Sequence, residues 1–122
     1  LNTALATAQS GVSFEDAHED RDFWGRLTES AVGAHLVNAA VSSAFDVFYW
    51  RERNRQVDFV VRAGRTLVAI EVKSGRRQDA RSGMDAFAEA FRPTRSLLVG
   101  RDGIALSEFL TMPVEQWLRP KS

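Results

Sequence analysis

The sequence predicts one α/β domain, in which a helix is followed by three strands, a second helix and a fourth strand. Two observations lead to this prediction. Short segments rich in valine, isoleucine and aromatic residues follow one another in the middle of the chain, and proline-free segments rich in alanine flank them. At 122 residues, 44% of them hydrophobic, the chain is long enough to bury a single core. We therefore expect one domain over residues 1–122.

The first helix is expected over residues 23–41, which contain no proline and in which alanine and leucine recur. Asp20 or Asp22 could cap its start. Apolar residues nearly encircle this helix, so we expect it to be buried on more than one side. Further helices are expected over residues 3–9, 83–91 and 113–118.

Three consecutive strand-like segments lie between the main helices. The first is aromatic, the other two are rich in β-branched residues, and a turn around Gly64 joins the second to the third. These three strands should form an antiparallel meander. A basic loop is expected over residues 74–82 and a turn at 102–103. The strands are expected at residues 45–51, 56–62, 66–73 and 96–100, with a short edge strand at 104–106.

The formal net charge is zero, but the charges are unevenly distributed. Between Arg51 and Arg81 the sequence has nine basic and four acidic residues, whereas the segment from Glu15 to Glu29 is acidic. Arginine side chains match phosphate oxygens, so a phosphate-bearing partner such as a nucleic acid explains the basic region. A solvated, arginine-rich surface explains it equally well.

Composition excludes several kinds of site. The chain has no cysteine and only two histidines, which leaves no disulfide framework, thiolate zinc site or histidine-rich metal site. It has no apolar run of about 18 residues and no charged-then-apolar leader, so we expect a cytoplasmic protein without membrane contact. Because the chain begins at Leu1 and not at methionine, we expect it to be part of a larger protein.

Three charged residues stand on the expected second and third strands: Asp58, Glu71 and Lys73. Side chains alternate along a strand, so Glu71 and Lys73 share a face at a spacing of about 6.6 Å. Antiparallel pairing can bring Asp58 beside them. Two neighbouring carboxylates repel each other unless a cation lies between them, and Mg²⁺ or Mn²⁺ would meet that need. In the alternative, Lys73 simply forms an ion pair with Asp58 or Glu71.

The first helix offers a third carboxylate, that of Glu29. It projects on the same side as Gly25 and Gly33, and each glycine costs a helix about 1 kcal/mol relative to alanine. Such glycines would allow the helix to approach the sheet closely, which would bring Glu29 to the edge of the carboxylate cluster. The alternative is a surface glutamate that pairs with Arg26.

The helix acid, the strand aspartate and the Glu-x-Lys pair together resemble the PD-(D/E)XK nuclease superfamily. More closely, four segments look like the domain of unknown function 4143, which follows an AAA-type ATPase module in many proteins. No proline precedes Asp58, and Gln56 stands where the closer family often has an acid. The four segments are Trp24–Glu29, Phe48–Arg51, Val57–Val61 and Ile70–Ser74.

The resemblance implies a three-layer α/β/α restriction-endonuclease-like fold, whose mixed sheet adds a parallel strand to the meander. The resemblance does not settle the activity; our hypothesis is a metal-dependent nuclease that hydrolyses DNA phosphodiester bonds. The sequence offers few groups for base-specific recognition, so we expect structure-selective or non-specific DNA binding. No phosphate-binding loop occurs here, so the ATPase module would lie outside this chain.

The resemblance also assigns roles to residues. Asp58 and Glu71 would hold Mg²⁺ or Mn²⁺ with the main-chain carbonyl of Val72, and Glu29 would support a second ion or act through water. Lys73 would orient the attacking water or neutralise charge on phosphorus. The expected contacts to the nucleic acid are Gln56, Arg51, Arg55, Arg76 and Arg77.

Two other functions fit the same sequence. The domain could be an inactive nuclease fold that docks onto or regulates its ATPase, with Phe48, Tyr49 and Trp50 on the partner surface. Alternatively, it could tether DNA without cleaving it. Aromatic residues at strand spacing are more often part of a core than of an interface.

Overall fold

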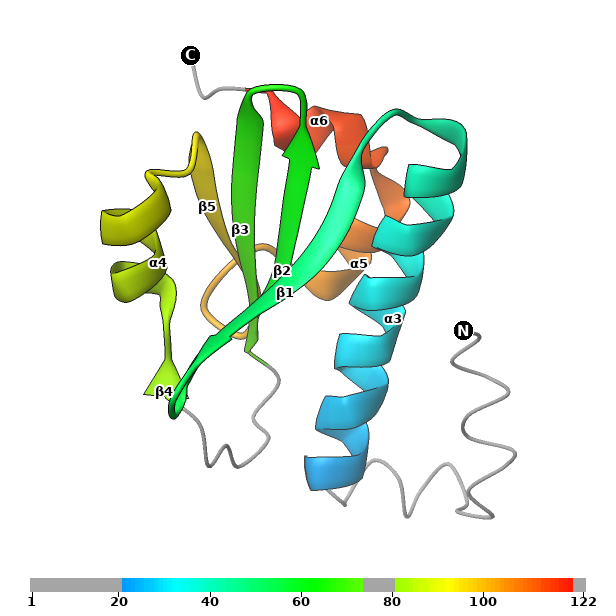
Figure 1. Cartoon of the computed structure of the whole chain (residues 1–122). Coiled ribbons are helices and arrows are strands. Elements are labelled where there is room, and N and C mark those ends of the chain that lie inside the picture. Colours follow the sequence, from blue (N-terminus) through cyan, green and yellow to red (C-terminus); the bar gives the residue numbers. More distant parts are fainter. Residues whose placement is uncertain (1–20, 74–80, 120–122) are drawn as a thin grey trace.

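The computed structural model describes residues 21–73 and 81–119, and it has an α/β fold with a mixed sheet between helices (Figure 1). The predicted fold class is confirmed. The elements are α3 (Arg21–Ser42), β1 (Asp46–Glu52), β2 (Arg55–Ala63), β3 (Thr66–Lys73), β4 (Arg81–Ser82), α4 (Met84–Phe91), β5 (Arg95–Gly100), α5 (Leu106–Thr111) and α6 (Val114–Leu118).

The strands follow the order β1-β2-β3-β5. β1 and β2 pair antiparallel, as do β2 and β3, so the predicted meander is confirmed. β5 then joins β3 in parallel, as expected of a strand that returns through a helix.

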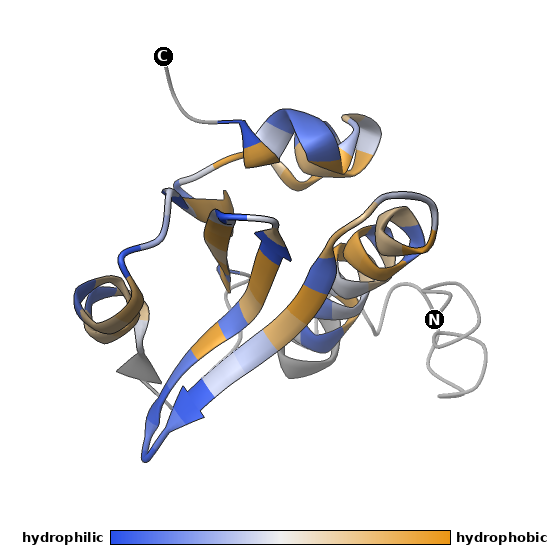
Figure 2. Cartoon of the chain, turned by 45° about the horizontal axis from the view of Figure 1, so that its top comes forward, coloured by the Kyte–Doolittle hydropathy of each residue, from blue (hydrophilic) through white to orange (hydrophobic). Residues whose placement is uncertain are grey.

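Two apolar cores lie on the two faces of the sheet. The larger core joins α3, α5 and α6 to one face through residues such as Leu36, Ile70 and Phe109. The smaller core joins α4 to the other face through Val60, Ala69 and Phe87. Figure 2 shows the resulting three layers, with α4 on one side of the sheet and the other helices on the opposite side.

β2 and β3 separate towards one end of the sheet. Their pairing runs from Ala63 opposite Thr66 to Phe59 opposite Ile70. Nearer its start, β2 pairs in parallel with the short strand β4. We call the place where the two strands separate, between residues 55–58 of β2 and 71–73 of β3, the β2–β3 split.

A β-bulge in β2 accompanies this separation. The register between β1 and β2 shifts between Phe48, opposite Val60, and Trp50, opposite Val57. As a result, Val57 and Val60 both belong to the core beneath α4, while Phe59 packs against the other core. A bulge bends its strand and redirects the side chains beside it, here those of the two intervening residues, Asp58 and Phe59.

The predicted elements agree with the observed ones to within two residues for the first helix, the four main strands, the helix at 83–91 and the helix at 113–118. Residues 81–82 are not part of a loop, because they pair with β2. The edge strand predicted at 104–106 is wrong. Only Ile104 bridges to Val99, and α5, which was not predicted, begins at Leu106. The helix expected at residues 3–9 lies outside the described residues.

The predicted burial of α3 on more than one side is also wrong. Val32 and Leu36 are fully buried, but Val37 is 53% exposed and Val41 is 85% exposed. One side of α3 packs on the sheet and on α5 and α6, and no described residue covers its other side. Within the described ranges, no helix combines the length and the apolar character needed to cross a membrane.

Candidate active site at the β2–β3 split

The carboxylate of Asp58 lies in the β2–β3 split. Its Oδ2 accepts a hydrogen bond from the main-chain N–H of Val72 at 2.8 Å, and its Oδ1 accepts one from Nε2 of Gln56 at 3.2 Å. Regular pairing of the two strands has ended at this point, so a side-chain oxygen of β2 replaces a main-chain acceptor. The aspartate therefore links the two separating strands.

The main-chain carbonyl of Val72 points towards the same split. In an extended strand the N–H and C=O of one residue point to the same side, and those of the next residue point to the other. The N–H of Val72 faces Asp58, and the C=O of Lys73 faces the opposite side, where it accepts the N–H of Arg101 at 2.9 Å. The split thus brings a carboxylate and a main-chain carbonyl together.

Glu71 and Lys73 share one face of β3. Leu67 and Ala69 pack in the core beneath α4, and alternation places Glu71 and Lys73 on that face too. Glu71 is half-buried and Lys73 is exposed. The predicted common face of the Glu-x-Lys pair therefore lies on the same side of the sheet as α4.

Lys73 has a partner that the sequence did not reveal. Its Nζ lies 3.5 Å from Oδ2 of Asp102, and both side chains are exposed to solvent. The alternative for Lys73 was an ion pair with Asp58 or Glu71, and the ion pair found for it among the described residues is with Asp102, after β5. Asp102 and the following glycine were interpreted only as a turn, and its place beside Lys73 follows from the parallel pairing of β3 with β5.

The turn after β5 packs tightly against the end of β3. Gly100 has a φ of +105°, and a Cβ built on it would lie 2.3 Å from the carbonyl oxygen of Lys73. Gly103 comes equally close to the carbonyl oxygen of Leu98. Only glycine allows this approach of two backbones. The turn therefore fixes the strand end that carries the Glu-x-Lys pair.

Glu29 is half-buried on α3, one turn before Gly33. A Cβ on Gly33 would lie 3.1 Å from the ring of Phe59, so the predicted close approach of helix and sheet is confirmed at this glycine. Arg26, the alternative partner of Glu29, is exposed. Glu29 lies on the face of α3 that carries the buried residues Val32 and Leu36.

Within residues 21–73 and 81–119, the structure holds no group of three histidine, aspartate or glutamate side chains that could bind a metal ion. In this conformation, a metal ion at the split would have fewer than three carboxylates from the described residues. Carboxylate and main-chain oxygens completed by water are ligands that Mg²⁺ uses in proteins. The donor atoms of Asp58 and Val72 thus fit a hard divalent ion.

The predicted nucleic-acid contacts are only partly brought together. Gln56 lies beside Asp58 and orients its carboxylate. Arg55 pairs with Glu52 at 3.1 Å in the β1–β2 hairpin, and Arg51 is exposed on β1. Arg76 and Arg77 lie outside the described residues.

Comparison with known proteins gave one match. A search of curated proteins and a search of solved structures both found none. A family model described as "Domain of unknown function (DUF4143)" matches residues 24–114 and includes the helix, the meander and the turn after β5. The resemblance to this family is confirmed. Because the match covers well over half of the 122 residues, the chain belongs to the DUF4143 family.

Proposed function

We propose that this chain is a metal-dependent nuclease domain of the PD-(D/E)XK type that hydrolyses DNA phosphodiester bonds. The observation that carries the proposal is the β2–β3 split. There, the carboxylate of Asp58 meets the backbone of Val72, whose carbonyl points the same way, directly after Glu71. Hard oxygen donors gathered at the ends of two strands suit Mg²⁺ or Mn²⁺.

Each residue then has a separate task. Asp58 and Glu71, with the carbonyl of Val72, would hold the ion at the split, and Glu29, on the helix that covers the face of the sheet opposite Glu71, would act through water. The bound ion supplies Lewis acidity towards the phosphate and lowers the pKa of water. Lys73 orients the attacking water and neutralises charge that develops on the phosphate oxygens. Asp102 keeps the ammonium group of Lys73 at the end of β3.

The same proposal names the partners. DNA is the substrate, and an AAA-type ATPase module precedes this domain in a larger cytoplasmic protein. Arg51 and Arg55 contact the DNA backbone from the β1–β2 hairpin, together with Arg76 and Arg77. Gln56 contacts phosphate or water beside Asp58.

Cleavage of plasmid and branched DNA with Mg²⁺ tests the chemistry. Asp58→Asn keeps an oxygen for the N–H of Val72 but removes the charge, and Lys73→Ala removes the ammonium group. Both variants should lose cleavage while their circular dichroism stays unchanged. Asp46→Asn is the matched control, because Asp46 is an exposed carboxylate on β1 that pairs with Arg62. Unchanged cleavage in either test variant would remove that residue from the mechanism.

Titration calorimetry with Mn²⁺ tests the metal site directly. Binding should be lost in Glu71→Gln and in Asp58→Asn and kept in Asp46→Asn. If wild type binds no Mn²⁺ at millimolar concentrations, the metal-dependent mechanism is wrong.

A second candidate function is an interaction module that docks onto the ATPase. Two observations favour it: the described residues contain no group of three histidine, aspartate or glutamate side chains that could bind a metal ion, and Phe48 and Tyr49 are exposed on β1. Tight association with the ATPase portion, without Mn²⁺ binding, would support this function. Salt-dependent DNA binding without turnover would instead indicate a tether.

A further inference from the structure

An aromatic groove lies between β1 and α4, on the face of the sheet that carries Glu71. Its volume is about 360 Å³. Val60 and Leu67 form its apolar floor, and aromatic rings form its walls. We call it the β1–α4 groove; its aromatic residues are Phe48, Tyr49, Trp50, Phe87 and Phe91.

Three of the rings, those of Trp50, Phe87 and Phe91, form a connected cluster that reaches the surface. Phe87 lies 4.8 Å from Phe91 and 5.6 Å from Trp50, measured between ring centroids. Phe87 is buried, whereas Phe91 is 52% exposed and Phe48 is 44% exposed. The groove therefore presents aromatic rings that are held in place by their neighbours and open to solvent. Such rings can stack on flat ligands.

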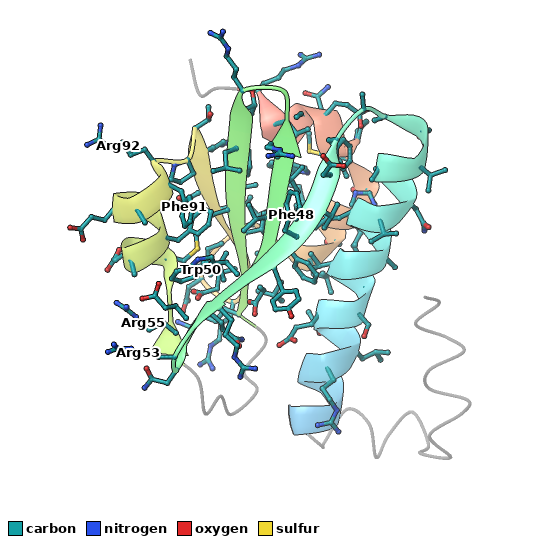
Figure 3. The ribbon with its side chains drawn as sticks, in the orientation of Figure 1. Phe48, Trp50, Arg53, Arg55, Phe91 and Arg92 are labelled. Atoms are coloured by element: carbon teal, nitrogen blue, oxygen red, sulfur yellow. The ribbon has the colours of Figure 1, made fainter. Side chains whose placement is uncertain are left out.

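One arginine, Arg62, lines the groove, and others lie near its ends (Figure 3). The guanidinium group of Arg62 lies over the ring of Phe48, 5.4 Å from its centroid. Figure 3 shows Arg92 at the end of α4 and Arg53 and Arg55 at the β1–β2 hairpin, so that guanidinium groups flank the aromatic cluster at both ends. Within the described ranges, Arg53 and Arg92 form no ion pair.

Two of these arginines occupy backbone positions that favour other residues. Arg53 has a φ of +58° and Arg92, at the end of α4, has a φ of +48°. Glycine or asparagine normally takes the left-handed conformation, at a helix end above all. An arginine at such a position is explained if its side chain has a binding task, because the backbone alone would favour glycine.

We propose that the β1–α4 groove binds single-stranded nucleic acid, with bases stacked on Phe91 and on the ring face of Phe48 that Arg62 leaves open, and with phosphates held by Arg53 and Arg92. Alternating aromatic faces and cationic side chains are the features with which proteins bind single strands without reading sequence. Double-stranded DNA offers no exposed base faces to these rings. Of the acids near the groove, Asp46 and Glu52 each pair with an arginine, and Glu89 of α4 lies in the adjoining hollow that also contains Trp50 and Arg55.

The groove borders the β2–β3 split. A Cβ on Gly83 would lie 2.7 Å from the ring of Trp50 and 3.0 Å from the main-chain nitrogen of Gln56, whose side chain bonds to Asp58. A single strand in the groove would therefore lie next to the candidate active site. Binding itself needs neither metal nor hydrolysis, so this inference goes beyond the proposed nuclease and can be tested apart from it.

Fluorescence anisotropy with labelled oligothymidylate and oligouridylate, measured in EDTA, tests the groove without catalysis. Phe91→Leu keeps the apolar bulk but removes the ring face, and should raise the Kd about tenfold, as expected for one lost stacking contact. Arg53→Gly combined with Arg92→Gly should also raise the Kd and flatten its dependence on salt. Both glycines suit the backbone, so thermal stability should not fall. Arg26→Ala, at an exposed arginine of α3, is the control and should bind as wild type does.

The two oligonucleotides distinguish RNA from DNA as the source of the single strand. No binding of either one by wild type at low salt would overturn the inference. So would a Kd that Phe91→Leu leaves unchanged, or equal binding of a duplex. If instead an acidic peptide with aliphatic side chains binds and Phe91→Leu retains it, the groove is a protein-docking site and the inference is wrong.

Discussion

Asp58 should prove to have a structural role that can be separated from its proposed chemical one. Its Oδ2 is the acceptor for the N–H of Val72 at a place where β2 no longer offers β3 a main-chain oxygen. Asp58→Ala removes that acceptor, whereas Asp58→Asn keeps one. The amide of asparagine can also satisfy Gln56, if the side-chain amide of Gln56 turns over and presents its oxygen.

The expected magnitudes follow from these contacts. Leaving the N–H of Val72 without a partner in the half-buried split should cost about 1–3 kcal/mol of unfolding free energy. For a domain of this size each kcal/mol lowers Tm by about 4 °C, so Asp58→Ala should melt about 4–12 °C below wild type. Asp58→Asn loses only the charge assistance to the hydrogen bond and should cost less than about 1 kcal/mol.

Urea denaturation followed by circular dichroism measures both variants, with equal m-values showing that the same transition is compared. Asp46→Ala serves as the control and should change stability by no more than about 0.5 kcal/mol, because its carboxylate is exposed. If Asp58→Asn is as unstable as Asp58→Ala, the charge and not the hydrogen bond secures the split. If Asp58→Ala is as stable as wild type, the hydrogen bond between Asp58 and the N–H of Val72 does not stabilise the fold.

Two further predictions concern the framework, and both are measured by urea denaturation. Gly100→Ala should lower the free energy of unfolding by well over about 2 kcal/mol, because the new Cβ would collide with the carbonyl of Lys73. Gly64→Ala, also at positive φ but in open space, is the control and should lower it by about 1 kcal/mol. Equal losses in the two variants would contradict the close approach of the two backbones. Leu36→Ala, in the core, should lower the free energy of unfolding by about 2–5 kcal/mol. Val41→Thr, at a position that is 85% exposed, should change it by no more than about 0.5 kcal/mol. A large loss of stability in Val41→Thr would mean that another part of the chain covers this side of α3.

Most of the fold could be predicted because local pattern and tertiary structure agree. The meander follows from β-branched residues and a glycine turn, and the first helix from a long segment without proline. The pattern failed at α5, a helix of only six residues that is too short to be stable alone. Contacts from α3 support α5. The ring of His35 packs against Phe109, and Nε2 of His35 forms a hydrogen bond with the carbonyl of Met112. None of these contacts can be inferred from the sequence around α5.

The candidate site was predictable only in part for a similar reason. Hairpin register and side-chain alternation were enough to place Asp58 near the end of β3 that carries the Glu-x-Lys pair. The bulge in β2 is not encoded in any short pattern, yet it accompanies the turning of the Asp58 carboxylate towards the N–H of Val72. Asp102 was missed because its proximity to Lys73 depends on the parallel pairing of β3 and β5, which are more than 20 residues apart.

The end of β3 is held from both sides through consecutive residues. On the β2 side, Asp58 accepts the N–H of Val72, and on the β5 side, the N–H of Arg101 donates to the carbonyl of Lys73. The backbone that carries the Glu-x-Lys pair is therefore fixed by groups that come from two other strands. A site on rigid strands keeps its geometry better than one on loops. It follows that Gly100→Ala should disturb the position of Lys73, and any chemistry that depends on it, without altering a single charged group.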